Sequence, residues 1–168
     1  MKKFRQMNEG FAWALEAKDT EGKINRLNEW AESCQCLVPV VRIGVGAEKH
    51  NWDLPEGMPD MADIEKDIPE GMGETSIQME WRRIVQFIQP TSNLNNLPAI
   101  KREGVWINIL EGIHHEEAAL LTAVKDGKLL ELYPSLEDVL APLGITEYNK
   151  PTKTKTKARA KKGVKKVS

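Results

Sequence analysis

The chain has 168 residues, with 24 basic and 25 acidic side chains and an apolar fraction of 40%. This size and composition indicate one ordinary globular domain with a real hydrophobic core. No run of eighteen apolar residues occurs, and polar residues follow the basic N-terminus directly. We therefore expect neither a transmembrane helix nor a secretory signal.

Two helices are predicted in the N-terminal part of the chain. Asn8 is the expected N-cap of a helix over residues 9–17, and Asp19 begins the second helix. The second helix has an apolar stripe at helical spacing. Its members are Ile24, Leu27, Trp30, Ala31 and Cys34.

Residues 37–45 form an apolar, β-branched run that is broken by Pro39 and closed by glycines. A run of this length is compatible with a buried strand or with a short buried helix, because periodicity does not separate the two. Pro39 argues against a central strand, where its missing N–H would break the ladder.

Residues 46–75 are rich in Gly, Pro, Asp and Glu and lack apolar periodicity. Two similar segments, residues 54–60 and 68–74, lie fourteen positions apart, and each has Pro two positions before Gly. This pattern predicts a type I turn in each copy. We expect a long ordered loop, and loops of this length are often functional.

Four further helices are predicted after the loop, within residues 75–89, 98–112, 114–127 and 135–142. Thr75-Ser76 is the expected N-cap of the first of these helices, and Gly127 ends the third. Ser135 and Asp138 have the spacing of a capping box for the last one.

Every charged residue among the last twenty, 149–168, is basic. They hold nine basic residues, which leaves 15 basic and all 25 acidic residues in the body, residues 1–148. The body therefore carries a charge of −10 and the tail +9. No aliphatic residue occurs in the tail before Val164 except alanine, so we expect it to be disordered when unbound. The candidate nucleic-acid-binding residues are Lys150, Lys153, Lys155, Lys157, Arg159, Lys161, Lys162, Lys165 and Lys166.

The fold class that these patterns predict is all-α. We expect a single domain over residues 1–148, with about six or seven helices in hairpin-like pairs. The long Pro/Gly-rich loop over residues 46–75 interrupts it, and the disordered basic tail over residues 149–168 follows it.

Several motifs resemble those of a small, uncharacterised protein family from large contractile-tailed bacteriophages. They are the loop motif Leu54-Pro55-Glu56-Gly57 with Pro59, the helix motif Ile100-Lys101-Arg102-Glu103 followed by residues 106–111, and the segment from His114 through Glu116-Glu117-Ala118 to Leu129. His115 departs from the family, which usually has Pro or a small residue there. The resemblance implies a phage source and an accessory or structural role, and it carries over no catalytic residue.

The densest group of possible metal ligands comprises Glu111, His114, His115, Glu116 and Glu117. Glu111 and His114 have the Glu-x-x-His spacing of di-iron bundles, but those sites need a second such motif, which the sequence lacks. We favour a helix junction in which a histidine caps the break and the acidic residues complement the helix dipole. No metal or other cofactor is expected.

For most of the remaining candidate site residues we favour a role in the structure over a role in function. Cys34 and Cys36 lack a second pair for zinc and are interpreted as buried, reduced thiols. Trp52 is expected to pin the loop to the body, and its exposure to a partner is the less favoured alternative. The other tryptophans, Trp13, Trp30, Trp81 and Trp106, lie on helix stripes. The basic pairs Arg82-Arg83 and Lys101-Arg102 either extend a phosphate footprint or form solvated helix faces.

The charge pattern favours a non-enzymatic protein that binds DNA or RNA through its tail, without base readout, and the resemblance implies that it is a phage accessory protein. The acidic body, including loop 46–75, would dock a phage or host protein partner or restrain the tail. Membrane binding is not expected, because the tail has no apolar anchor. The alternatives are a virion structural or assembly protein and, less favoured, an enzyme or metalloprotein. The expected location is the host cytoplasm, with packaging in the virion left open.

Overall fold

The computed structural model describes residues 3–59, 74–89 and 93–150. Within these ranges the regular structure is entirely helical, which confirms the predicted fold class. Seven α-helices are present: α1 (Met7–Leu15), α2 (Thr20–Ala31), α3 (Leu37–Gly44), α4 (Ile77–Ile84), α5 (Ala99–Gly112), α6 (His115–Asp126) and α7 (Leu129–Leu132). Three 3₁₀ helices join them: η1 (Val85–Phe87), η2 (Asn93–Asn96) and η3 (Pro134–Val139).

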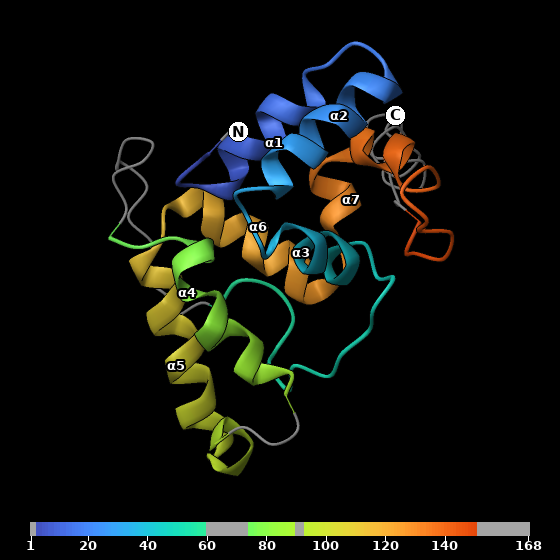
Figure 1. Ribbon diagram of the computed structural model, residues 1–168. Coiled ribbons are helices and arrows are strands. Elements are labelled where there is room, and N and C mark those ends of the chain that lie inside the picture. The colour runs from blue at the N-terminus through green and yellow to red at the C-terminus, as the bar shows by residue number, and fades with distance from the viewer. Residues whose placement is uncertain (1–2, 60–73, 90–92, 151–168) are drawn as a thin grey trace, which may run out of the picture.

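Helix α6 is the centre of the packing, since α1, α3, α5 and α7 all contact it (Figure 1). Its apolar side is completely buried and consists of Ala118, Leu120, Leu121 and Val124. A helix that is covered on several sides needs such a broad apolar surface. No helix within the described ranges has the length and apolarity that a membrane span requires.

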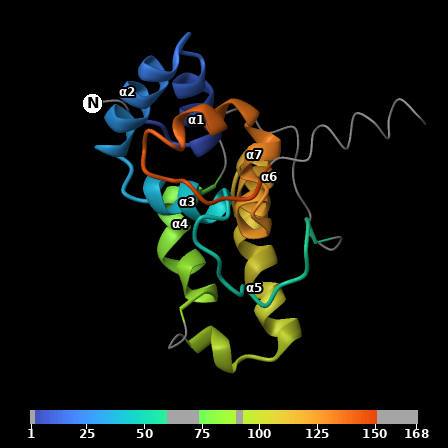
Figure 2. The ribbon, with the colours of Figure 1, turned by 90° about the vertical axis from the view of Figure 1, so that its right-hand side faces the viewer.

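Helices α4 and α5 form an antiparallel pair that extends from the rest of the molecule (Figures 1 and 2). At one end of the pair, the backbone N–H of Thr75 donates to the carbonyl oxygen of Gly112 at 2.9 Å. At the other end, Arg102 donates to the carbonyl oxygen of Phe87 at 2.7 Å. These contacts confirm a helical hairpin in this part of the chain.

The run over residues 37–45, which was compatible with a strand or a helix, forms helix α3 up to Gly44, with Val45 as its C-cap. Pro39 is the third residue of this helix. A proline in the first turn is tolerated, because the N–H that it lacks would have no partner within the helix. The long run of β-branched residues therefore packs as a buried helix.

Three predicted helix boundaries are confirmed by their caps. The side chain of Asp19 accepts a hydrogen bond from the N–H of Gly22, and Ser76 accepts one from Met79. Gly127 ends α6 with a left-handed backbone, at φ +71°. Short polar side chains and glycine supply partners and geometry that helix ends lack.

Two predicted caps are wrong. Helix α1 has Gln6 at its N-cap position, and Asn8 lies inside the first turn with its side chain donating to Glu116 at 3.0 Å. The expected capping box at Ser135 is replaced by the 3₁₀ helix η3, which has Tyr133 at its N-cap position and no side-chain cap. The side chain of Asn8 bonds a residue far away in the chain and so does not cap its own helix. Pro134 occupies the first position of η3 and thereby moves the start of this last helix.

The loop that follows α3 is held to the body over residues 46–59. Trp52 is buried and its ring packs against that of Trp106, with 5.6 Å between centroids, as predicted for a pinned loop. Gly57 donates its N–H to Asp126 at 3.0 Å instead of closing the expected type I turn on Leu54. The second predicted turn, at residues 68–74, lies almost wholly outside the described residues.

Gly10 allows α1 and α2 to pack closely. A Cβ atom at Gly10 would lie well inside van der Waals contact with the fully buried ring of Trp30. We expect Gly10→Ala to lower the free energy of unfolding by about 1–3 kcal/mol, because the ring has no free space to move into. Urea denaturation followed by circular dichroism measures this change.

Gly104 is the matched control for this prediction. It lies inside α5, and nothing lies within 4 Å of the position that a Cβ atom would occupy there. Gly104→Ala should raise the free energy of unfolding by about 0.5–1 kcal/mol, through helix propensity alone. Equal stabilisation by both substitutions would show that the contact between Gly10 and Trp30 is not tight.

Candidate nucleic-acid interface

The basic tail begins at a fixed point on the body. The backbone N–H of Asn149 donates to the carbonyl oxygen of Val45 at 2.7 Å, and its side-chain amide donates to that of Gly127 at 3.0 Å. The hydroxyl of Tyr148 donates to Glu137 at 2.9 Å. Of the nine predicted binding residues only Lys150 is described, and the other eight, in residues 151–168, lie outside the described residues.

Two glycines make room for this attachment. Gly46 at φ +88° and Gly127 at φ +71° both have backbone conformations that favour glycine. A Cβ atom at either position would collide with the side-chain amide of Asn149. The C-terminal ends of α3 and α6 therefore form the binding site for Asn149, the first residue of the tail.

Charged groups of both signs lie where the tail leaves the body. One hollow beside Asn149 is lined by Glu48, Lys49, His50, Lys125 and Asp126, and a second one by Asp126, Lys128, Glu131 and Lys150. Glu48 and Asp126 already have cationic partners, Arg42 at 2.8 Å and Lys125 at 2.6 Å. The ammonium of Lys150 lies over the ring of Tyr148, 4.6 Å from its centroid. The root of the tail is therefore a region of mixed charge.

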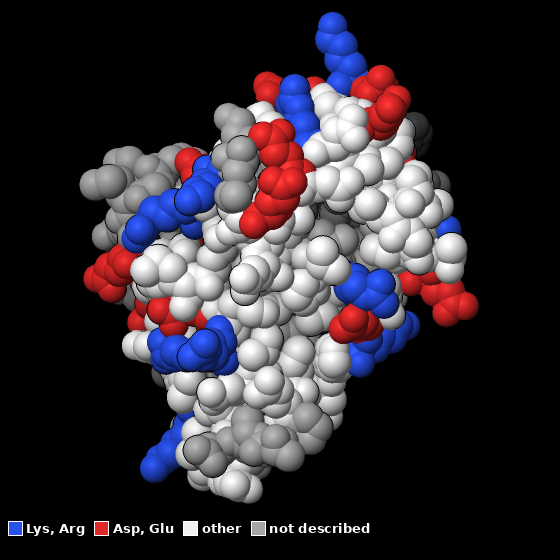
Figure 3. All heavy atoms as spheres, viewed as in Figure 1, with Lys and Arg blue, Asp and Glu red and all other residues white. Residues whose placement is uncertain are grey.

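The two predicted basic pairs do not join the tail. Both belong to the α4–α5 hairpin, whereas the root of the tail lies at the ends of α3 and α6 (Figure 1). Arg83 is paired with Glu80 at 2.9 Å. The face over α3 is mostly uncharged, with Lys, Arg, Asp and Glu scattered around its edge (Figure 3). On that face no continuous basic patch extends the tail.

Arg102 is neither a phosphate contact nor part of a solvated helix face, and both predictions for it are wrong. Its side chain is buried at 3% exposure and donates to three backbone carbonyl oxygens. These belong to Trp52 at 2.9 Å, Phe87 at 2.7 Å and Leu94 at 2.9 Å. Arg102 therefore ties the loop, η1 and η2 to α5.

The predicted helix junction at residues 111–117 is confirmed. His114 is the N-cap of α6, and its Nδ1 accepts a hydrogen bond from the N–H of Glu116 at 3.1 Å. Across the ranges that the structure describes, no three His, Cys, Asp or Glu side chains are grouped to hold a metal ion. The Glu-x-x-His spacing in this segment is a feature of the junction.

Glu117 has a role that the sequence did not reveal. It is fully buried, and its two carboxylate oxygens accept hydrogen bonds from the N–H groups of Met7 at 2.7 Å and Ile77 at 3.1 Å. Met7 and Ile77 are the first residues of α1 and α4. Burial raises the pKa of Glu117 to about 7, although both hydrogen bonds act in the opposite direction.

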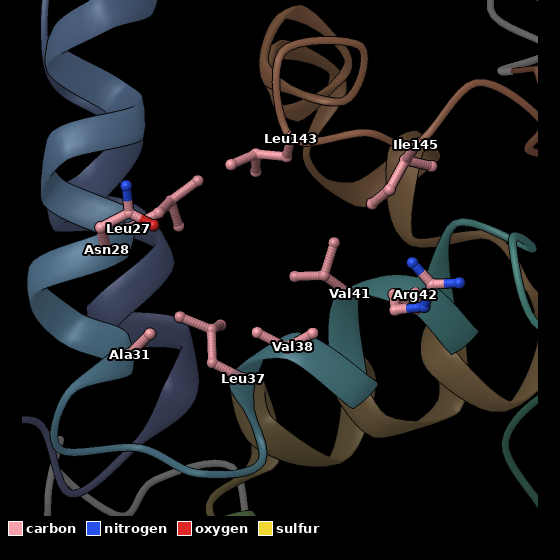
Figure 4. Close-up of a pocket in the computed structure, with 9 residues that line it drawn as sticks. All are labelled: Leu27, Asn28, Ala31, Leu37, Val38, Val41, Arg42, Leu143 and Ile145. Atoms are coloured by element: carbon pink, nitrogen blue, oxygen red, sulfur yellow. The ribbon is translucent and has the colours of Figure 1, made fainter.

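An apolar groove of 140 Å³ lies between α2, α3 and residues 143–145 (Figure 4). Leu27, Val41, Leu143 and Ile145 point into it, and the one charged lining residue, Arg42, is paired with Glu48 at 2.8 Å. The volume is that of a site for one small apolar group, on the order of a benzene-sized molecule. This lining does not suit phosphate, so the groove is not part of the nucleic-acid interface.

The described structure is an all-α body with a basic appendage rooted at Asn149. The chain belongs to DUF6433, a family of unknown function, which matches residues 12–131. The match begins within α1, ends within α7 and stops before the basic tail. No curated protein and no solved structure matches the chain.

Proposed function

We propose that this protein is a non-enzymatic bacteriophage accessory protein that binds DNA or RNA electrostatically through residues 149–168. The observation that carries the proposal is the separation of charge along the chain, with +9 in the tail and −10 in the body. The phage source rests on the sequence resemblance described above. Blocks of like charge of this size are typical of interaction tails.

Counterion release supplies the affinity. Each phosphate that a Lys or Arg neutralises frees condensed cations, so the logarithm of the binding constant falls with the logarithm of the salt concentration. Nine basic residues set a limiting slope of about −8 on duplex DNA. The tail has no aromatic residue to stack on bases, so binding is blind to sequence.

The acidic body restrains this binding. The fixed root holds the tail close to a body whose residues 1–148 carry a charge of −10. A polyanion must therefore compete with the molecule's own carboxylates, and only a dense array of phosphates wins that competition. Docking of a protein partner by the body, with loop 46–75 as a contact, belongs to the same proposal.

Truncation after Lys150 should abolish binding to nucleic acid. The full chain should bind a labelled DNA duplex at low salt and lose about 10³- to 10⁵-fold in affinity between roughly 50 and 200 mM salt, the upper value if all nine basic residues contact phosphates. The truncated chain keeps the hydrogen bonds of Tyr148 and Asn149 to the body, so it should fold normally. Fluorescence anisotropy at several salt concentrations measures both.

A chain of full length with the eight basic residues beyond Lys150 replaced by Gln separates charge from length. It should behave as the truncated chain does, with unchanged circular dichroism. A truncated protein that binds as tightly as the full chain would refute the proposal. A peptide of residues 149–168 should bind more tightly than the full chain, and equal affinity would remove the restraining role of the body.

A further inference from the structure

Three sulfur atoms from three separate segments meet inside the body. Met7 begins α1, Cys34 follows α2, and Cys36 is the N-cap residue of α3. The Sγ atoms of Cys34 and Cys36 are 3.6 Å apart, and the Sγ of Cys36 is 3.8 Å from the Sδ of Met7. All three side chains are buried, with at most 4% of their surface exposed.

Cys34 and Cys36 are two residues apart at the start of α3, so the connection before this helix brings their sulfurs together. A thiolate is the form of cysteine that binds metals, so both cysteines bind a metal in their deprotonated form.

The cluster lies next to a way in from solvent. Cys36 lines an open hollow of 660 Å³ between the α2–α3 connection and α4. Ser33, Gln78 and Met79 also line it. The sulfur cluster therefore has one member, Cys36, in the wall of a hollow that is open to solvent.

We propose that Met7, Cys34 and Cys36 form a binding site for one Cu(I) ion. Thiolates and thioethers are the soft ligands that select Cu(I). A metal with three sulfur ligands at about 2.3 Å in a plane requires the sulfurs to be about 4.0 Å apart. The two observed separations, 3.6 and 3.8 Å, are within a few tenths of an ångström of that value.

The ligand set distinguishes Cu(I) from zinc. Zinc in a structural site takes four ligands and uses Cys, His, Asp or Glu. Within the described ranges no group of three such side chains is arranged to hold a metal, whereas the thioether of Met7 completes a three-sulfur set. Binding converts two thiols to thiolates and releases two protons, which leaves a complex with a net charge of −1.

Titration of the full-length protein with Cu(I) under anaerobic conditions, in competition with the chelator bathocuproine disulfonate, tests the site. We expect one Cu(I) per chain and an X-ray absorption spectrum with three sulfurs at about 2.3 Å and no nitrogen or oxygen. Fewer sulfurs, a nitrogen or oxygen ligand, or no competition with the chelator would overturn the proposal. These measurements need no variant.

Variants locate the ligands. The double variant Cys34→Ala/Cys36→Ala should not compete with the chelator, and Met7→Leu should bind Cu(I) at least about tenfold more weakly. Met79→Leu, which alters an exposed methionine of the same hollow, should bind as the wild type does. Wild-type affinity in Met7→Leu, or tighter binding of Zn(II) than of Cu(I) by the wild type, would refute the three-sulfur Cu(I) site.

Discussion

Arg102→Met should lower the free energy of unfolding by about 3–5 kcal/mol. The methionine side chain is similar in length but donates no hydrogen bond, so the carbonyl oxygens of Trp52, Phe87 and Leu94 lose the donor observed in the structure. Each buried polar group left without a partner costs about 1–3 kcal/mol, which the apolar replacement only partly offsets. Urea denaturation monitored by tryptophan fluorescence reports the change, because Trp52 and Trp106 adjoin the site.

Arg102→Lys is the control that separates charge from geometry. The three carbonyl oxygens come from the loop after α3, from η1 and from η2, and the guanidinium reaches them with three different nitrogens. A lysine ammonium keeps the charge but is a single point and cannot span them. We expect an intermediate loss of stability and faster proteolysis of residues 46–59. Wild-type stability in Arg102→Lys would show that the fork geometry is not required.

The sequence predicted the helices well because local signals and the tertiary structure agree at most positions. Asp19, Ser76 and Gly127 are caps whose hydrogen-bond partners lie within a few residues. Residues 37–45 were ambiguous because a short apolar run has no distinguishing period, and packing against α6 decides for helix. Asn8 failed as a cap because its side chain bonds Glu116, 108 residues away.

The buried polar residues could not be predicted for the same reason. Periodicity identifies apolar stripes but does not show which charged residue faces inward. Arg102 stands beside Lys101 in a sequence that is typical of an exposed helix face, yet only Arg102 is buried. The partners of Glu117 lie 110 and 40 residues away, at the starts of two other helices. Such groups come together only when the whole fold forms.

The basic tail, in contrast to these buried residues, could be predicted from composition alone. Nine basic residues in twenty are evident without a structure. The structure adds the root, where Asn149 bonds the ends of α3 and α6. The only trace of that attachment in the sequence is the pair of glycines Gly46 and Gly127. Their role becomes clear only in the structure, where both have a positive φ angle and lie close to Asn149.

Glu117→Ala should lower the free energy of unfolding by about 3–5 kcal/mol. The carboxylate joins the first turns of α1 and α4 to α6, and its removal takes the acceptor from the buried N–H groups of Met7 and Ile77. The cost of two such groups adds to that of the cavity left by the side chain. Thermal and urea denaturation measure the loss, and the packing of α1 and α4 on α6 should weaken first.

Glu117→Gln tests the role of the ionised form. The pKa of Glu117 is raised from 4.5 to about 7, so its stabilising contribution is complete below about pH 4.5 and is lost as the pH rises through 7. A rise of this size corresponds to about 3 kcal/mol. Glutamine does not titrate, so the stability of the wild type relative to Glu117→Gln should fall by about that amount between roughly pH 4 and 8. The difference between the two proteins cancels the titration of other groups. A difference that stays constant with pH would show that the pKa of Glu117 is not raised, and that the two N–H donors outweigh the cost of burying its charge.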